Sequence, residues 1–145
     1  MISYANFRKL RLTQFLPDAK VKKLDGWEFM GHLWIGEAIG FSEWLCFEST
    51  PEVLGSLAID FKEFPELPAL EVLRTIDLPV LPGMDIRDLS KVLGEPVNEL
   101  RFTNDRVSYE FVVSGPPRYD VSCTVLNKGG LTYLVVMVPL LDSGG

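Results

Sequence analysis

The sequence has little of the chemistry on which most enzymes depend. It contains one histidine, His32, and two cysteines, Cys46 and Cys123. A catalytic triad or a metal site would have to include His32, whose neighbours at alternate positions, Met30 and Trp34, are apolar. The glycines also lack the spacing of a phosphate-binding loop. We therefore expect a structural histidine, no catalysis, no cofactor and no bound metal.

Two further shortages argue against membrane and nucleic-acid functions. No apolar run approaches the roughly 20 residues that span a bilayer, and the stretch "MISYANFRKLRLTQFLPD" shows neither a signal peptide nor a lipid-accepting cysteine. The 14 Lys and Arg residues are outnumbered by 20 Asp and Glu, and a net charge of -6 repels phosphate backbones and attracts basic partners. We expect a cytoplasmic protein that contacts neither nucleic acid nor membrane. Its oligomeric state stays open.

The chain does contain enough apolar material for one domain. Hydrophobic residues make up 47% of its 145 positions, which suffices for a core without disulfide support. Cys46 and Cys123 both fall in strand-like runs, a pattern that favours two buried thiols and leaves a disulfide between them open. We predict a single domain over residues 1–145, with a flexible tail over 141–145.

The first half, residues 1–64, is predicted to be mostly β structure. Apolar and polar side chains alternate in "GWEFMGHLWIG", "FSEWLCFES" and "SLAIDFK", which is the period of a strand. A short helix is favoured within residues 1–16, although the periodicity there fits a strand as well. "TPEVLG" has the cap, the proline and the final glycine of a short helical turn that ends at Gly55.

The second half begins with two predicted helices. Apolar residues recur at helical spacing over 68–76. A second helix is sharply bounded at 85–93. Asp85 can cap its N-terminus, with Asp88 at the capping-box position, and Gly94 supplies the left-handed stop.

Four alternating segments follow these helices and predict an antiparallel meander. The expected strands span about residues 97–103, 106–114, 118–126 and 131–138, and a two-residue Asn-Asp turn joins the first pair. The last segment, "LTYLVVMVP", is apolar on both faces, which is typical of a central or covered strand. The predicted fold class is α+β: short helices on one face of a predominantly antiparallel sheet, with a helix pair followed by a four-stranded meander in the C-terminal half. Whether the first half shares this sheet stays open.

The stretch "GMDIRDLSKVLGEP" resembles the Gly-Met-(Ser/Thr/Asp)-x-x-x-(Val/Leu)-x-x-x-(Leu/Val)-Gly-x-Pro segment of SmpA/OmlA-type lipoproteins and of β-lactamase inhibitor protein. The order of elements, two helices and then four strands, extends the resemblance over residues 65–140. The resemblance implies a protein-binding function in which the sheet face opposite the helices makes the contact.

The alternation identifies the residues of that face. If the larger apolar residues pack on the helices, the outward positions are Ser108, Glu110, Asp120, Ser122, Thr124 and Thr132. Such a face is polar and acidic, and ordinary solvated positions are the alternative interpretation of the same pattern. Trp34 joins these candidates, because Trp27 and Trp34 have opposite parity on one strand and an exposed tryptophan is a preferred interface anchor.

The leading hypothesis is a non-enzymatic protein that binds and neutralises another protein of basic charge, as an inhibitor or immunity-type protein does. The second is a small-ligand-binding domain, with a pocket near the N-terminal strands lined by Trp34 or Trp44. The third is a cryptic enzyme, in which His32 and Cys46 on adjacent strands form an imidazole–thiol pair.

Overall fold

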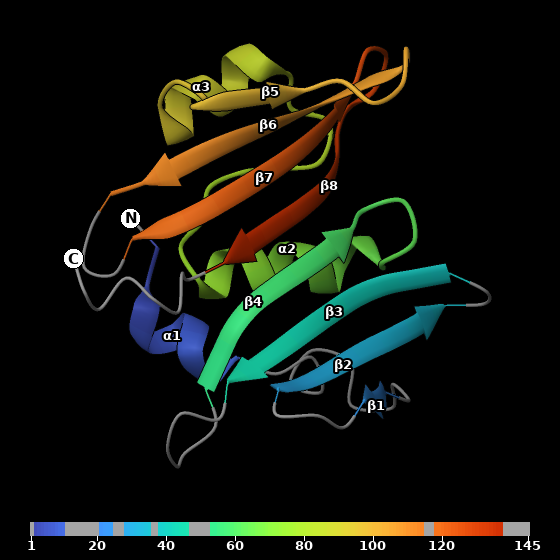
Figure 1. The fold of residues 1–145 in the computed structure, drawn as a ribbon, viewed down its shortest axis with the longest axis vertical. Coiled ribbons are helices and arrows are strands. Elements are labelled where there is room, and N and C mark those ends of the chain that lie inside the picture. Colours follow the sequence, from blue (N-terminus) through green and yellow to red (C-terminus); the bar gives the residue numbers. More distant parts are fainter. Residues whose placement is uncertain are drawn as a thin grey trace.

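One antiparallel sheet runs through the computed structural model, which describes residues 2–10, 21–24, 28–35, 38–46, 53–114 and 118–137. The strands are β1 (Val21–Leu24), β2 (Glu28–Ile35), β3 (Ala38–Cys46), β4 (Val53–Asp60), β5 (Asn98–Leu100), β6 (Arg106–Val113), β7 (Tyr119–Leu126) and β8 (Gly130–Met137). The helices are α1 (Tyr4–Lys9), α2 (Glu66–Thr75) and α3 (Ile86–Leu93). The described strands lie in the order β1-β2-β3-β4-β8-β7-β6-β5, each antiparallel to its neighbours (Figure 1).

The pairing of β4 with β8 joins the two halves of the chain. Ser56 faces Met137 and Asp60 faces Tyr133 across this pair, so the strands of the first half extend the C-terminal meander into a single sheet. The meander itself, β5 to β8, follows the helix pair as predicted. The predicted α+β fold class is therefore confirmed, and the question of a shared sheet is answered.

All three described helices pack on the same face of the sheet. One buried cluster contains Phe7 of α1, Val72 of α2 and Leu89 of α3 together with inward side chains of the strands. α1 contacts β4, α3 contacts β6, and α2 passes behind β4 in Figure 1. Among the described helices, none is both long and apolar enough to cross a membrane.

Along the strands, buried side chains alternate with less buried ones, as the alternating sequence pattern predicts. On β7, Tyr119, Val121, Cys123 and Val125 are buried, whereas the intervening side chains are only partly covered. The ring of Tyr119 meets that of Phe7 edge-on at 5.6 Å between centroids, which ties α1 to the C-terminal half. Cys123 is a free thiol, and burial raises its pKa to about 12.

Helix α3 begins and ends as its local sequence predicts. The Asp85 carboxylate accepts from the Asp88 amide at 2.9 Å, and the Asp88 carboxylate accepts from the Asp85 amide at 3.4 Å. These bonds satisfy backbone donors that the first helical turn leaves open. Gly94 then takes a φ of 87° and ends the helix.

Two glycines join the start of α3 to the β7–β8 turn. Gly83 donates its amide to the Leu131 carbonyl at 3.0 Å, and Leu131 donates back to the Met84 carbonyl at 2.8 Å. This pair of bonds brings the backbone of Gly83 directly against Gly130. The hairpin that carries β7 and β8 is thereby fixed to the segment that introduces α3.

Two local predictions are wrong, and in each case contacts with another strand or turn override the local pattern. The helical turn predicted to end at Gly55 is instead the start of β4, where Val53 pairs with Cys46 of β3. The two-residue turn before β6 is a loop over 101–105, because β5 ends at Leu100.

Side-chain hydrogen bonds hold the 101–105 loop, and the Asn-Asp turn pattern in the sequence does not predict them. The Asp105 carboxylate accepts from the Thr103 hydroxyl at 2.6 Å and from the Arg106 guanidinium at 2.9 Å. Asn127, from the β7–β8 turn, donates its side-chain amide to the Asn104 carbonyl at 2.6 Å. Strand β1 was not predicted, and the predicted tail, 141–145, lies outside the described residues.

Candidate binding groove on the open face of the sheet

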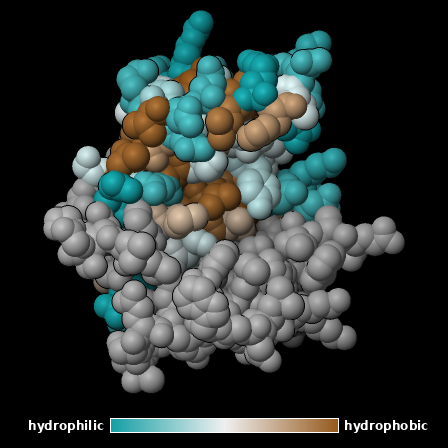
Figure 2. All heavy atoms as spheres, in the orientation of Figure 1, coloured by the Kyte–Doolittle hydropathy of each residue, from teal (hydrophilic) through white to brown (hydrophobic). Residues whose placement is uncertain are grey.

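The face of the sheet opposite the helices carries the candidate site. None of the described helices lies on it in Figure 1, and Figure 2, in the same view, shows hydrophobic side chains gathered among hydrophilic ones. Val112 is 38% exposed and Met137 is 44% exposed on this face. The sequence predicts a polar and acidic face, and the structure adds exposed apolar side chains to it.

The strand register arranges this face in three rows across β4, β8, β7 and β6. The first row is Ser56, Met137, Asp120 and Val112, the second is Ala58, Val135, Ser122 and Glu110, and the third is Asp60, Tyr133, Thr124 and Ser108. Neighbours within a row are close enough for their side chains to interact.

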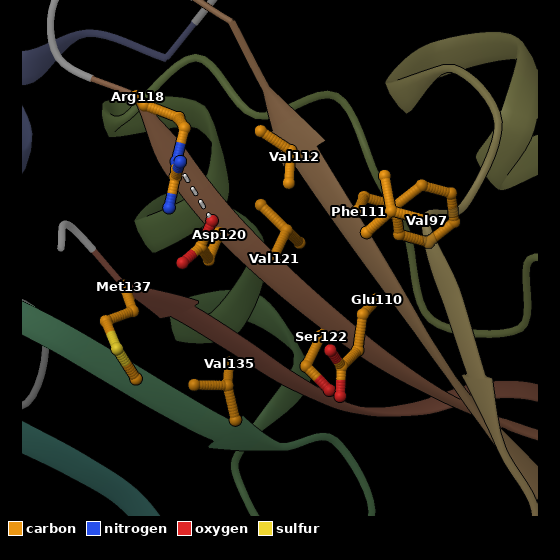
Figure 3. Close-up of a pocket in the computed structure, with 10 residues that line it drawn as sticks. All are labelled: Val97, Glu110, Phe111, Val112, Arg118, Asp120, Val121, Ser122, Val135 and Met137. Carbon is orange, nitrogen blue, oxygen red and sulfur yellow. Dashed lines mark ion pairs between the residues drawn. The ribbon is translucent and has the colours of Figure 1, made fainter. Parts of the chain in front are cut away.

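A groove of about 410 Å³ lies over the first two rows. Figure 3 shows its lining, which consists of Val97, Glu110, Phe111, Val112, Arg118, Asp120, Val121, Ser122, Val135 and Met137. The side chains of Phe111 and Val121 are buried on the helix side, so their backbone forms part of the groove floor. Val112, Val135 and Met137 supply its apolar wall.

An exposed ion pair stands at one end of the groove, and a further carboxylate stands apart from it. Arg118 Nε lies 3.4 Å from Asp120 Oδ1, and the two side chains are 45% and 42% exposed (Figure 3). An ion pair that is so exposed contributes at most about 1 kcal/mol to stability. Asp120 Oδ1 is nevertheless shielded from solvent, and no donor among the described residues makes a hydrogen bond to it. Glu110 stands beside Ser122 on the neighbouring strand.

The polar side chains of the third row interact with one another. The Ser108 and Thr124 hydroxyls share a hydrogen bond of 3.0 Å. The pKa of Tyr133 is raised above its ordinary value, first by partial burial and then by the negative charge of Asp60. These groups therefore form a polar border beside the groove.

The structure places the predicted face residues in three different settings. Glu110, Asp120 and Ser122 come together in the groove. Ser108 and Thr124 lie on the same face outside it, bonded to each other. Thr132 falls at an irregularity in the β7–β8 register, where Tyr133 stands opposite Thr124, and the Thr132 carbonyl accepts from Phe61 at 2.9 Å.

The backbone register also locates the candidates in the N-terminal strands, whose side chains lie outside the described part of the structure. Trp34 of β2 stands opposite Ile39 of β3. His32 stands opposite Ser42, four residues before Cys46 on β3. At about 3.4 Å per residue, His32 and Cys46 are separated by about 14 Å along the strands. Among the described residues, no three His, Cys, Asp or Glu side chains are grouped as metal ligands would be.

Sequence reasoning missed the apolar part of the groove, although one signal for it was present. "LTYLVVMVP" is apolar on both faces and predicts a central or covered strand. β8 is central, between β4 and β7, and its outward side chains Val135 and Met137 form the groove wall. Arg118 and Val97 stand at the first positions of the predicted strands 118–126 and 97–103, where alternation alone does not single out a groove residue, and in the structure both lie just before β7 and β5.

Comparison with known proteins adds a distant likeness in structure. No family model and no curated protein matches the chain. A crystal structure of a DUF4309 family protein from Bacillus subtilis matches over 84% of this chain and 66% of that chain, with a TM-score of 0.36 and 11% sequence identity.

Proposed function

We propose that the protein binds a basic partner protein through the open face of its sheet and neutralises it, as inhibitor and immunity-type proteins do. The observation that carries the proposal is the groove, in which Val112, Val135 and Met137 adjoin the carboxylates of Glu110 and Asp120. Apolar side chains on an otherwise solvated face favour protein contact. The carboxylates and the net charge of -6 favour a basic partner.

Two features of the sequence support the same proposal. The resemblance of residues 65–140 to SmpA/OmlA-type lipoproteins and β-lactamase inhibitor protein implies contact through this face. The chain also offers little catalytic chemistry, with one histidine and with Cys123 buried as a thiol of raised pKa. A cytoplasmic location belongs to the proposal as well.

The open face around the groove is large enough to anchor a partner but not to supply a whole interface. Three rows across four strands cover about 400 Å², from a strand spacing of about 4.8 Å and a rise of about 3.4 Å per residue. A stable interface takes about 800 Å² from each partner. The exposed side chain of Val97, which precedes β5 at the adjacent sheet edge and lines the groove, adds to the available surface.

Site-specific photo-crosslinking in the native host tests this proposal. The photoreactive residue benzoylphenylalanine is placed at Tyr133 or Met137 on the open face, or at Leu67, which is 73% exposed on α2. We expect one protein to be captured covalently from both open-face positions and not from Leu67. Capture from Leu67 alone, or from none of the three positions, would overturn the proposal.

The captured partner then allows a matched comparison of two charge reversals. Glu110→Arg lies in the groove, whereas Glu71→Arg makes the same charge change on an exposed position of α2. We expect Glu110→Arg to weaken binding by about tenfold or more and Glu71→Arg to leave it within about twofold. Equal effects of the two variants would mean that only net charge matters and that the face is not the binding site.

A further inference from the structure

The groove already contains one cationic side chain, and that side chain is weakly held. The Arg118 guanidinium comes no closer than 3.4 Å to the Asp120 carboxylate, and both side chains are nearly half exposed. Asp120 Oδ1 is shielded from water without accepting a hydrogen bond from any described residue. A carboxylate oxygen in this state has an unused capacity to accept from a better-placed donor.

A second carboxylate stands within reach of the first. Glu110 of β6 pairs with Ser122, and Asp120 of β7 pairs with Val112, so the two acids are diagonal neighbours across the β6–β7 pair. Diagonal positions are about 7–8 Å apart, a span that long side chains bridge. No lysine or arginine other than Arg118 lines this groove among the described residues.

The rest of the groove suits the stem of a long cationic side chain. Val135 and Met137 of β8 lie beside Asp120 and Ser122 and present apolar surface to the groove (Figure 3). Arginine buries its methylene stem on such surface while its guanidinium stays with polar groups. Its planar fork also donates to two carboxylates in a way that the point charge of lysine does not.

We infer that the groove receives one arginine side chain of the partner protein, which replaces Arg118 at Asp120, reaches Glu110 and lays its stem on Val135 and Met137. The inference rests on the proposed function and names the chemistry that the groove selects. Arg118 is then an internal competitor that holds the site until the partner arrives. Since an exposed pair is weak, its removal strengthens arginine binding by at most about fivefold.

Titration of the full-length, ¹⁵N-labelled protein with N-acetyl-arginine amide tests the inference without a known partner. The matched probe is N-acetyl-citrulline amide, which has nearly the same shape and no charge. We expect the amide resonances of Glu110, Asp120 and Ser122 to shift saturably with the arginine probe and much less with citrulline. Equal responses to the two probes, or shifts confined to other parts of the molecule, would overturn the inference.

Two pairs of variants separate the groove from general electrostatics. Glu110→Gln should weaken binding of the arginine probe several-fold, whereas Glu99→Gln, which removes the same charge from an exposed position on β5, should not. Arg118→Ala should tighten binding by up to about fivefold, whereas Arg87→Ala on α3 should leave it unchanged. The inference is wrong if the members of either pair behave alike, or if Arg118→Ala weakens binding.

The two proposals can fail independently. If crosslinking at Tyr133 captures a partner while the arginine probe leaves the groove amides unmoved, the face binds protein and the arginine occupant is wrong. If the probe binds as expected and no position captures a partner, the protein-binding function is wrong, and the groove binds an arginine side chain that does not belong to a partner protein.

Discussion

Replacement of Gly130 by alanine tests the contact that fixes the β7–β8 hairpin to the start of α3. Gly130 has a φ of 76°, and a Cβ atom at this position would overlap the carbonyl of Gly83 and approach its Cα at 2.8 Å. Both neighbours are backbone atoms, so no side chain can move aside to relieve the overlap. The segment around Gly83 must therefore shift away from the hairpin.

The cost of Gly130→Ala has two parts. An alanine in the left-handed region costs about 1–2 kcal/mol. Displacement of Gly83 also disturbs its bond to Leu131 and the return bond from Leu131 to Met84, each of which contributes about 0.5–1.5 kcal/mol. We expect the free energy of unfolding to fall by about 2–5 kcal/mol, a large share of the roughly 5–15 kcal/mol typical of a domain.

Gly94→Ala is the matched control for this substitution. Gly94 has a φ of 87° and a ψ of -172°, and its Cβ would meet no atom within 4 Å, so only the conformational cost of about 1–3 kcal/mol applies. Urea unfolding of both variants, followed by circular dichroism, gives the two free energies from transitions of equal slope. If Gly130→Ala lowers the free energy of unfolding by no more than Gly94→Ala does, the close contact between Gly130 and Gly83 does not contribute to stability as described.

The remaining predictions concern the cap of α3 and the buried thiol. The backbone amide of Asp88 lowers the pKa of Asp85 below its ordinary 3.8, so the stabilising contribution of Asp85 is complete above pH 3.8 and is lost as the pH falls through the lower folded-state value. Acid unfolding followed by circular dichroism should therefore depend less steeply on pH in Asp85→Asn than in the unaltered protein, and an unchanged acid limb would contradict this assignment. Cys123 is fully buried with a pKa of about 12, so iodoacetamide at pH 8 should label it only as fast as the protein opens. Peptide mass spectrometry that finds Cys123 labelled at the rate of a free thiol in the folded protein would show that β7 is not covered by the helices.

The parts of the fold that the sequence predicts well are those that depend on neighbouring residues. The capping box of Asp85 and Asp88 needs only four consecutive positions, and the structure confirms it. The alternation on β6 and β7 places Glu110, Asp120 and Ser122 on the open face, because a strand turns successive side chains to opposite sides. Local rules therefore suffice to choose which face of the meander is open.

The parts that the sequence does not predict depend on contacts with another strand or turn, which the local pattern does not specify. Local cap signals before Gly55 favour a helical turn, yet pairing with β3 draws Val53 and Leu54 into β4. Asn127, which lies in the turn between β7 and β8, holds the loop before β6 through a hydrogen bond to the Asn104 carbonyl. The pairing of β4 with β8, which brings Ala58 opposite Val135, has no local signature at all.

The groove combines both kinds of determinant, which explains why its acids were predicted and its apolar wall was not. Glu110 and Asp120 follow from the alternation of β6 and β7. Val135 and Met137 lie on β8, where alternation fails because both faces are apolar. A central strand in a sheet with one uncovered face does not need apolar side chains on that face for its own folding. Their presence beside the carboxylates is the feature on which the proposed contact with a partner rests.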